Sequence, residues 1–212
     1  MPLNRNFLAL ALAAAIAPQA QAHFNLLEPD SWIEEDRLGD PQKAGPCGGV
    51  SANPASNTPA NPGKPTTKVT RVQGGQKLHI KVRETVFHPG FYRVALSVNS
   101  RDELPKDPEV ITKPSDRGAW SVSGKIVYPP MPPVLADGLF QHTTRVAGTG
   151  ELETDIEIPN INCTKCTLQI IQFMADHGLN RDGDYSYHHC ADLQIRADPY
   201  KPVDTRFPAE KK

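Results

Sequence analysis

His23 follows the tripeptide Ala20-Gln21-Ala22, a small-x-small pattern typical of signal-peptidase cleavage sites. Cleavage there would make His23 the first residue of the mature protein. A free N-terminal histidine offers two nitrogen donors, its α-amine and its ring Nδ1, which can chelate one metal ion. An α-amine has an ordinary pKa of about 7.7–8.0, so a strong Lewis acid can displace its proton near neutral pH. Nitrogen-rich tetragonal sites favour Cu(II), so this residue predicts one bound copper ion.

A second imidazole, His88, stands in the sequence His88-Pro89-Gly90, just before a strand-like run that begins at Phe91. A rigid corner at the end of a strand can hold a side chain firmly enough to serve as a metal ligand. The pair Pro-Gly is also typical of ordinary turns, which need no metal. His88 is therefore a candidate ligand that gains weight only together with other donors.

The segment Tyr187-His188-His189-Cys190 places a phenol and two imidazoles at the start of the last predicted strand. His188 and His189 are adjacent, so in an extended chain their side chains face opposite ways. At most one of them can point toward a shared centre, and the sequence leaves open which one. The alternative for each is a histidine that faces solvent.

The first 22 residues have the features of a secretory signal peptide. Arg5 supplies the positive start, and residues 7–16 form an apolar run that is too short to cross a bilayer as a helix. No later segment is apolar enough for a membrane anchor. We expect a secreted or periplasmic protein. In the uncut chain the nitrogen of His23 is an amide, which cannot form the chelate.

The mature chain would have 22 basic and 24 acidic residues once Arg5 is removed, a formal charge of −2. This balance argues against nucleic acid or an anionic membrane surface as a partner. About 190 residues are enough for one domain with a sizeable core. We place a copper-binding domain at residues 23–200 and a charged, loose C-terminal tail at residues 201–212.

The four cysteines form an even set, which in an exported protein predicts disulfide bonds. Three pairings are possible. Cys163 and Cys166 could close on each other, which would leave Cys47 to pair with Cys190. A Cys-x-x-Cys motif can also be a redox or metal site, although no βαβ pattern supports that here.

Much of the remaining sequence alternates between apolar and polar residues with a period of two. This pattern predicts strands and is clearest within residues 78–83, 92–98, 152–158 and 191–196. Residues 168–173 form a continuous run of apolar residues and glutamine. Residues 23–67 and 100–150 are loop-like, and the second segment could contain a short helix. The prediction is an all-β protein, an antiparallel immunoglobulin- or fibronectin-like β-sandwich with long loops.

The order of the motifs, an N-terminal His, a His-Pro-Gly turn and Tyr-x-x-Cys-Ala before the last strand, resembles the lytic polysaccharide monooxygenases. The most similar pattern is that of the fungal cellulose-active enzymes and their bacterial relatives. The resemblance implies that His23 and His88 form a T-shaped histidine brace around copper. It also implies that Tyr187 takes the axial position.

The same resemblance implies a role for His177 and one pairing of the cysteines. His177 follows an Ile-Ile run and stands ten residues before Tyr187, where the family often carries a histidine that donates to the oxygen species. Tyr187 and His177 are therefore the expected catalytic residues. The family also joins a cysteine of the N-terminal loop to the one after the axial Tyr, which corresponds to Cys47 and Cys190.

One position departs from the fungal pattern. The fungal enzymes carry a Gln two residues before the axial Tyr, where it hydrogen-bonds an oxygen species, whereas this chain has Tyr185. Gln169 or Gln172, from the preceding predicted strand, would have to substitute for it.

A second resemblance concerns the start His-Phe and the motif Pro-Cys-Gly-Gly. Both are similar to those of a monooxygenase-like group that binds copper without cutting sugar. In that group a carboxylate joins the copper site, and the candidates in this chain are Asp36, Asp40 and Asp192.

Four further residues have weaker signals. Glu84, four residues before His88, could orient a metal ligand, but a solvated charge at a strand end is the simpler expectation. Trp32 could stack on a sugar or belong to the core. His79 and His142 lie in no motif and are expected to be ordinary surface or packing residues.

The expected function is oxidative cleavage of a polysaccharide with one copper ion, O₂ or H₂O₂, and electrons from an external reductant. We expect a monomer. The alternative is a non-catalytic copper-binding or copper-delivery protein of the periplasm or cell surface, which a recessed or carboxylate-capped copper would favour. A third hypothesis, a secreted adhesion module, requires that the histidines coincide by chance.

Overall fold

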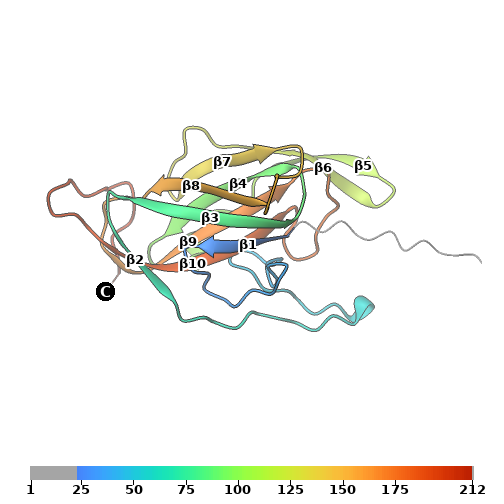
Figure 1. The fold of residues 1–212 in the computed structure, drawn as a ribbon, viewed down its shortest axis with the longest axis horizontal. Coiled ribbons are helices and arrows are strands. Elements are labelled where there is room, and N and C mark those ends of the chain that lie inside the picture. The colour runs from blue at the N-terminus through green and yellow to red at the C-terminus, as the bar shows by residue number, and fades with distance from the viewer. Residues whose placement is uncertain (1–22, 212) are drawn as a thin grey trace, which may run out of the picture.

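The computed structural model describes residues 23–211, and strands dominate its secondary structure (Figure 1). Within this range there is no α-helix, and two short 3₁₀ helices, η1 (Pro54–Ser56) and η2 (Arg101–Glu103), lie in the loops. The strands, in chain order, are β1 (His23–Glu28), β2 (Val69–Gln73), β3 (Lys77–Val86), β4 (Gly90–Ser97), β5 (Val110–Ser115), β6 (Gly118–Gly124), β7 (Val134–His142), β8 (Glu151–Glu157), β9 (Cys163–Met174) and β10 (Ser186–Arg196). The predicted signal peptide, residues 1–22, lies outside the described residues.

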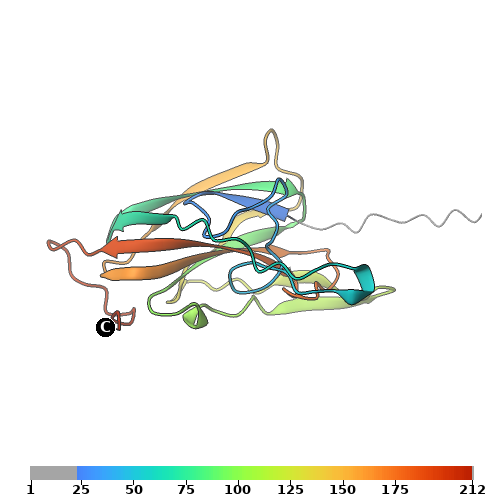
Figure 2. The same cartoon turned by 90° about the horizontal axis from the view of Figure 1, so that it is seen from below.

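The strands form two stacked sheets and a separate hairpin (Figure 2). One sheet has the order β1-β3-β8, and the other has the order β2-β10-β9-β4-β7. Strands β5 and β6 form the hairpin. Paired strands are antiparallel except β2 and β10, which are parallel. The prediction of an all-β sandwich is confirmed, and the parallel pair is the one difference in strand direction.

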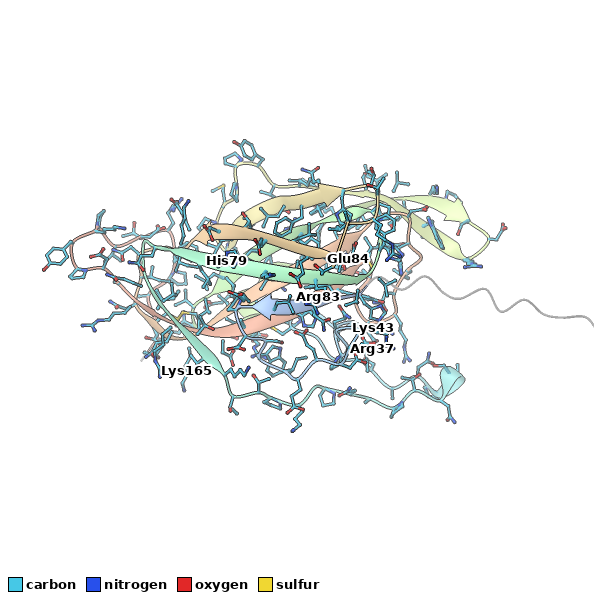
Figure 3. All side chains as sticks on the ribbon, in the orientation of Figure 1. Arg37, Lys43, His79, Arg83, Glu84 and Lys165 are labelled. Carbon is cyan, nitrogen blue, oxygen red and sulfur yellow. A yellow bond between two sulfur atoms is a disulfide. The ribbon has the colours of Figure 1, made fainter. Side chains whose placement is uncertain are left out.

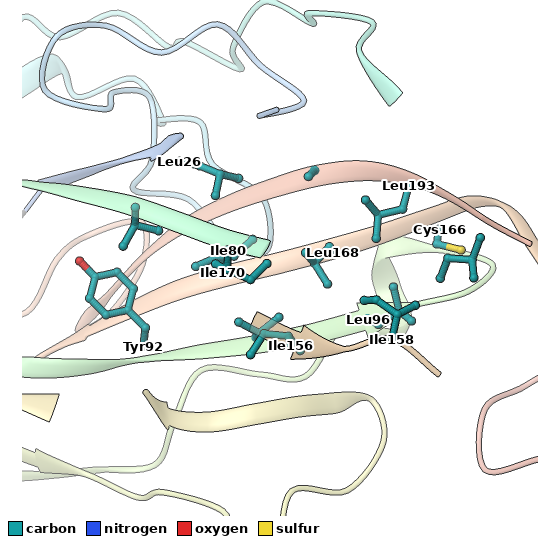
Figure 4. Close-up of a cluster of buried hydrophobic side chains, with 14 of the residues drawn as sticks. Leu26, Ile80, Tyr92, Leu96, Ile156, Ile158, Cys166, Leu168, Ile170 and Leu193 are labelled. Carbon is teal, nitrogen blue, oxygen red and sulfur yellow. The ribbon is translucent and has the colours of Figure 1, made fainter. Parts of the chain in front are cut away.

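The core lies between the two sheets and is filled by alternate residues of the strands (Figure 4). Along β3, Ile80 and Val82 are fully buried, whereas Lys81 and Arg83 form ion pairs with Glu151 of β8 on the outer face. A slip of the register by one residue would bury these charges and expose the apolar side chains. The period-two pattern therefore sets both the pairing and the buried face of β3.

Strand β9 is buried along most of its length, which explains its continuous run of apolar residues and glutamine. It is the central strand of its sheet, between β10 and β4. Its inner face meets the core. On its outer face, Phe173 packs with Phe91 and Tyr185, and it approaches Gly124 of the β5–β6 hairpin.

Two segments predicted to be loops contain strands. Strand β1 lies in the first segment, where Phe24 and Leu26 are buried and the backbone pairs with β3. Strands β5, β6 and β7 lie in the second segment, together with the 3₁₀ helix η2. Their own patterns are short and broken by prolines, and the partner strands supply the hydrogen bonds that hold them extended.

The C-terminal tail is ordered against the sandwich, and the prediction of a loose tail is wrong. Phe207 is buried and belongs to the main core cluster. The backbone of Asp204 donates to the Asn160 carbonyl at 2.9 Å, and the backbone of Lys211 donates to the Asn99 side chain at 2.6 Å. One buried aromatic ring and these hydrogen bonds outweigh the charged composition of the segment.

Two disulfide bonds, Cys47–Cys190 and Cys163–Cys166, are present. The first joins the long loop after β1 to strand β10. Trp32 packs beside that bond, since its Nε1 donates to the Cys47 carbonyl at 2.7 Å and the guanidinium of Arg101 lies 3.8 Å above its ring. One face of the Trp32 ring is therefore covered by Arg101. Among the described residues, no helix has the length and apolar character needed to cross a membrane.

Candidate metal centre

The pairing of β1 with β3 brings His23 and His88 to the same end of the sandwich. His23 stands opposite Val86 at the end of β3, and His88 follows two residues later. Burial, the neighbouring His177 and, to a smaller extent, His23 lower the pKa of His88, which reflects the proximity of His23 and His88. Two residues that are far apart in sequence thus become neighbours through strand register.

The ring of His23 is held by a carboxylate. Its Nε2 lies 3.2 Å from Oδ2 of Asp40. Because a carboxylate only accepts, Nε2 carries the proton of a neutral ring, and Nδ1 keeps its lone pair. Nδ1 is the nitrogen that a chelate with the α-amine requires. Burial opposes ionisation of Asp40, but the hydrogen bond from His23 and the nearby Lys43 help to outweigh it, so the pKa of Asp40 is lowered.

Of the three predicted carboxylate candidates, Asp40 is the one whose side chain lies against the His23 ring. The side chain of Asp36 accepts from the backbone nitrogens of the turn that follows it, including that of Asp40 at 3.0 Å. Asp192 pairs with Arg101 at 3.1 Å. Asp36 and Asp192 therefore serve the loop and the sheet rather than the candidate metal centre.

His88 has the chemistry of a metal ligand. The residue is buried, and its Nδ1 has no hydrogen-bond partner within the described part of the chain. Burial, and then the neighbouring His177, lower the pKa of His88 to about 4, so the ring is neutral at pH 7 and keeps a lone pair. The following Gly90 is required because a Cβ there would collide with the Phe173 carbonyl oxygen.

Tyr187 and His177 each stack edge-on against one of the two predicted ligands. The Tyr187 ring lies 5.2 Å from the ring of His23, and the His177 ring lies 4.8 Å from that of His88. Burial raises the pKa of the Tyr187 phenol, so it stays neutral. Nδ1 of His177 donates to the Gly178 carbonyl. A neutral His177 therefore presents Nε2 as an acceptor, and only its protonated form could donate there.

A buried carboxylate supports the His88 turn. Oε1 of Glu84 accepts from Nε2 of His142 at 3.0 Å, from Nε2 of Gln172 at 3.0 Å, and from the backbone nitrogen of His88 at 3.3 Å. The expectation of a solvated charge at Glu84 is wrong, because β3 ends beneath the turn and the side chain is 2 % exposed. Figure 3 places Glu84 at that end of β3.

His142 is likewise part of this support, so of the two expectations, a surface or a packing residue, the structure shows a packing residue. Its Nε2 faces Glu84, and its Nδ1 lies 2.7 Å from the Phe140 carbonyl oxygen. Both neighbours accept hydrogen bonds, and the pKa of His142 is raised, first by the hydrogen bond with Glu84. The other unassigned histidine, His79, pairs with Asp155 on the outer face, as expected of a surface residue.

We expect Glu84→Gln to weaken Cu(II) binding about 10-fold, because loss of a group that orients a metal ligand typically costs 10–100-fold in affinity. The neutral amide cannot accept three hydrogen bonds as the carboxylate does. Competitive titration with a chelator measures the affinity. An unchanged affinity and an unchanged Cu(II) spectrum would show that Glu84 serves folding alone.

The two glutamines that were candidates to replace the fungal Gln donate hydrogen bonds to other protein groups. Gln172 donates to Glu84, and Nε2 of Gln169 donates to the Pro46 carbonyl at 2.9 Å. The phenol of Tyr185 donates to the Ala119 carbonyl at 3.2 Å. In these hydrogen bonds, the side chains of Gln169, Gln172 and Tyr185 contact groups other than the rings of the candidate centre.

His188 and His189 face opposite ways, as adjacent residues of a strand must, and both are fully buried, so the solvent-facing alternative is wrong. Nε2 of His188 lies 2.8 Å from Asp107, on the outer side of the sheet. Nε2 of His189 donates to the Phe24 carbonyl at 3.0 Å, on the core side. The hydrogen bonds of these rings do not involve His23 or His88.

Sequence reasoning missed the acidic partners of these two histidines. Nδ1 of His189 lies 3.1 Å from Oε1 of Glu35, and burial raises the pKa of that carboxyl to about 7. Burial also lowers the pKa of His189 to about 4. Glu35 and Asp107 are distant from the histidines in sequence and belong to no motif, so only the folded loops identify them.

Within residues 23–211, no group of three or more His, Cys, Asp or Glu side chains is placed so that it could hold a metal ion. A brace needs only two imidazoles and the α-amine of His23. The buried, neutral ring of His88 and the carboxylate that accepts a hydrogen bond from the His23 ring fit such a donor set.

Comparison with known proteins adds little. No family model matches this chain, and no curated protein matches it. Among solved structures, the chain is similar to a chitin-binding domain from Burkholderia pseudomallei, with 13 % sequence identity and a TM-score of 0.42, over 82 % of this chain and 100 % of that domain. A similarity at this level says nothing about what this chain binds.

Proposed function

We propose that the protein is exported, is cleaved before His23, and then holds one copper ion between His23 and His88 for the oxidation of polysaccharides. The observation that carries the proposal is the register of β1 on β3, which sets His23 opposite Val86 and beside the His88 turn. The disulfides fit an oxidising compartment outside the cytoplasm.

The residues around the centre have distinct tasks in this proposal. Asp40 would hold the His23 ring through Nε2 and so leave Nδ1 available to the metal, and Glu84 holds the turn that carries His88. Tyr187 would place a neutral phenol beside the His23 ring, and His177 would lie next to the His88 ring, where a polar side chain can act on the oxidant. Copper, when bound and reduced, would supply the activation of O₂ or H₂O₂ that oxidation of a sugar C–H bond requires.

The test combines spectroscopy with turnover. Mature protein that starts at His23 is expected to bind one Cu(II) with three nitrogen ligands, detected by electron paramagnetic resonance. With a reductant and a panel of polysaccharides, it is expected to release oxidised oligosaccharides, detected by mass spectrometry. One tightly bound copper without oxidised products on any polysaccharide would contradict the oxidative function.

A second candidate function, copper storage or delivery, is favoured by one contact. Asp40 Oδ2 lies 3.2 Å from Nε2 of His23, so a carboxylate stands next to the proposed brace, on the side of the ring away from Nδ1. Such a protein would bind copper with the same residues but would not turn over. Rapid consumption of H₂O₂ by the reduced copper form would weigh against it.

A further inference from the structure

A cleft of about 490 Å³ opens beside the candidate metal centre, and His177 and Tyr187 form part of its lining. Sites for small molecules typically have volumes of about 300–1,000 Å³. Three segments surround this cleft: the loop after β1, the turn between β5 and β6, and the loop between β9 and β10. A ligand in it would lie directly against residues of the centre.

Each of the three segments contributes one cation to the lining, namely Lys43, Arg117 and Arg181. Among the described lining residues, Asp182 is the single carboxylate, and it accepts a hydrogen bond from the Ser51 backbone at 2.8 Å. The cleft is therefore cationic, although the whole chain has a formal charge of −1. A concave cationic surface concentrates anionic ligands.

The cations differ in how they are held. Arg181 donates to the Ala52 carbonyl at 2.6 Å, which fixes its guanidinium near the cleft wall. Lys43 lies close enough to Asp40 to help lower the pKa of that carboxyl. Arg117 is exposed on the β5–β6 turn. Arg117 is therefore the cation whose replacement disturbs the fold least.

The other lining groups suit a sugar ring. Trp120 forms one wall, and its orientation is set by the hydrogen bond from Nε1 to Asp176 at 2.8 Å. Asn180 also belongs to the lining, and its Nδ2 is buried and has no hydrogen-bond partner in the described part of the chain. Side chains with hydroxyl and amide groups complete the lining: Ser51, Asn53, Ser56 and Thr58. Sugars combine apolar ring faces with hydroxyl edges, which match such a surface.

We propose that this cleft binds an acidic oligosaccharide, a single chain whose sugar rings carry carboxylates. A concave site receives one chain, whereas a crystalline polymer requires a flat face. The Arg and Lys side chains would pair with the carboxylates, and Trp120 would pack against a ring face. The inference rests on the proposed function for the role of the bound chain, but the binding itself needs no copper.

The experiment measures binding to copper-free mature protein by calorimetry, with oligogalacturonates and with cello-oligosaccharides of equal length as probes. We expect the acidic probe to bind more tightly, with an affinity that falls as salt is added. Arg117→Gln is expected to weaken that binding about tenfold, the loss of one charge-assisted contact. Lys165→Gln, at the far end of the molecule from Lys43 (Figure 3), is the matched control and should leave the affinity unchanged.

Equal binding of the neutral and acidic probes would overturn the proposal, as would equal losses in the two variants. Displacement of the acidic probe by citrate at the same concentration would also overturn it, since that marks a site for small anions without recognition of sugar. These outcomes are separate from the proposed function. A protein that oxidises only neutral glycans would refute this inference and support the oxidative activity. Binding of the acidic oligosaccharide without oxidation of any polysaccharide would support this inference and refute the oxidative activity.

Discussion

A form of the protein with five extra residues, Gly-Ser-Gly-Ser-Gly, before His23 is expected to bind Cu(II) at least about 100-fold more weakly than the mature form. Loss of a residue that merely orients a metal ligand typically costs 10–100-fold in affinity, and the extension removes a ligand itself. The α-amine of His23 becomes an amide nitrogen, whose lone pair is delocalised into the carbonyl group, so it is a much poorer metal donor than a free amine. The ring of His23 and its contact with Asp40 remain in place.

The measurement is a competitive titration of both forms against a Cu(II) chelator. Electron paramagnetic resonance of the extended form should report one nitrogen ligand fewer. A five-residue extension is chosen because a one- or two-residue extension would bring its own amine close to the imidazole and create a new chelate. Equal affinities for the two forms would refute the brace, whatever the activity of the mature protein.

Replacement of His88 by Ala is expected to lower Cu(II) affinity by a similar factor of at least about 100, because it removes the imidazole that closes the brace. His88 is buried with a neutral ring and an unpartnered Nδ1, so its loss removes a donor without breaking a hydrogen bond of that atom. The backbone nitrogen of His88 still donates to Glu84 in the variant. The turn should therefore keep its position.

The matched control is His79→Ala. His79 lies in β3, the strand that leads to His88 (Figure 3). Its side chain is on the outer face and pairs with Asp155. The His79→Ala variant should bind copper with the affinity of the parent protein. Thermal unfolding of the copper-free variants separates a folding defect from loss of a ligand. If His88→Ala binds copper as tightly as His79→Ala does, His88 is not a ligand.

Strand periodicity was sufficient to predict the sandwich, because apolar alternation along β3, β4 and β10 marks the face that must be buried. It was insufficient for β1 and β5, whose extended form depends on hydrogen bonds from partner strands. The tail was mispredicted for a related reason. Its charges are visible in the sequence, but the burial of Phe207 in the core depends on residues that are distant in sequence.

In the candidate centre, too, some residues were predictable from the sequence and others were not. His23, His88, His177 and Tyr187 were identified from residue type and motif order, and the fold brings the four rings into two edge-on pairs. The groups that hold them were not identifiable in advance. Asp40 was one of three equal candidates, and Glu84 was expected to be solvated.

The sequence by itself determined the chemistry on offer: a histidine at a cleavage site, a second on a turn, and a fold of alternating strands. Only the tertiary structure decided which carboxylates support those histidines, that His188 and His189 belong to other contacts, and that a cationic cleft lies beside Tyr187. Motifs are local properties of the chain. Burial and the partner of a polar atom depend on residues that are distant in sequence, and they exist only after the sheets have packed.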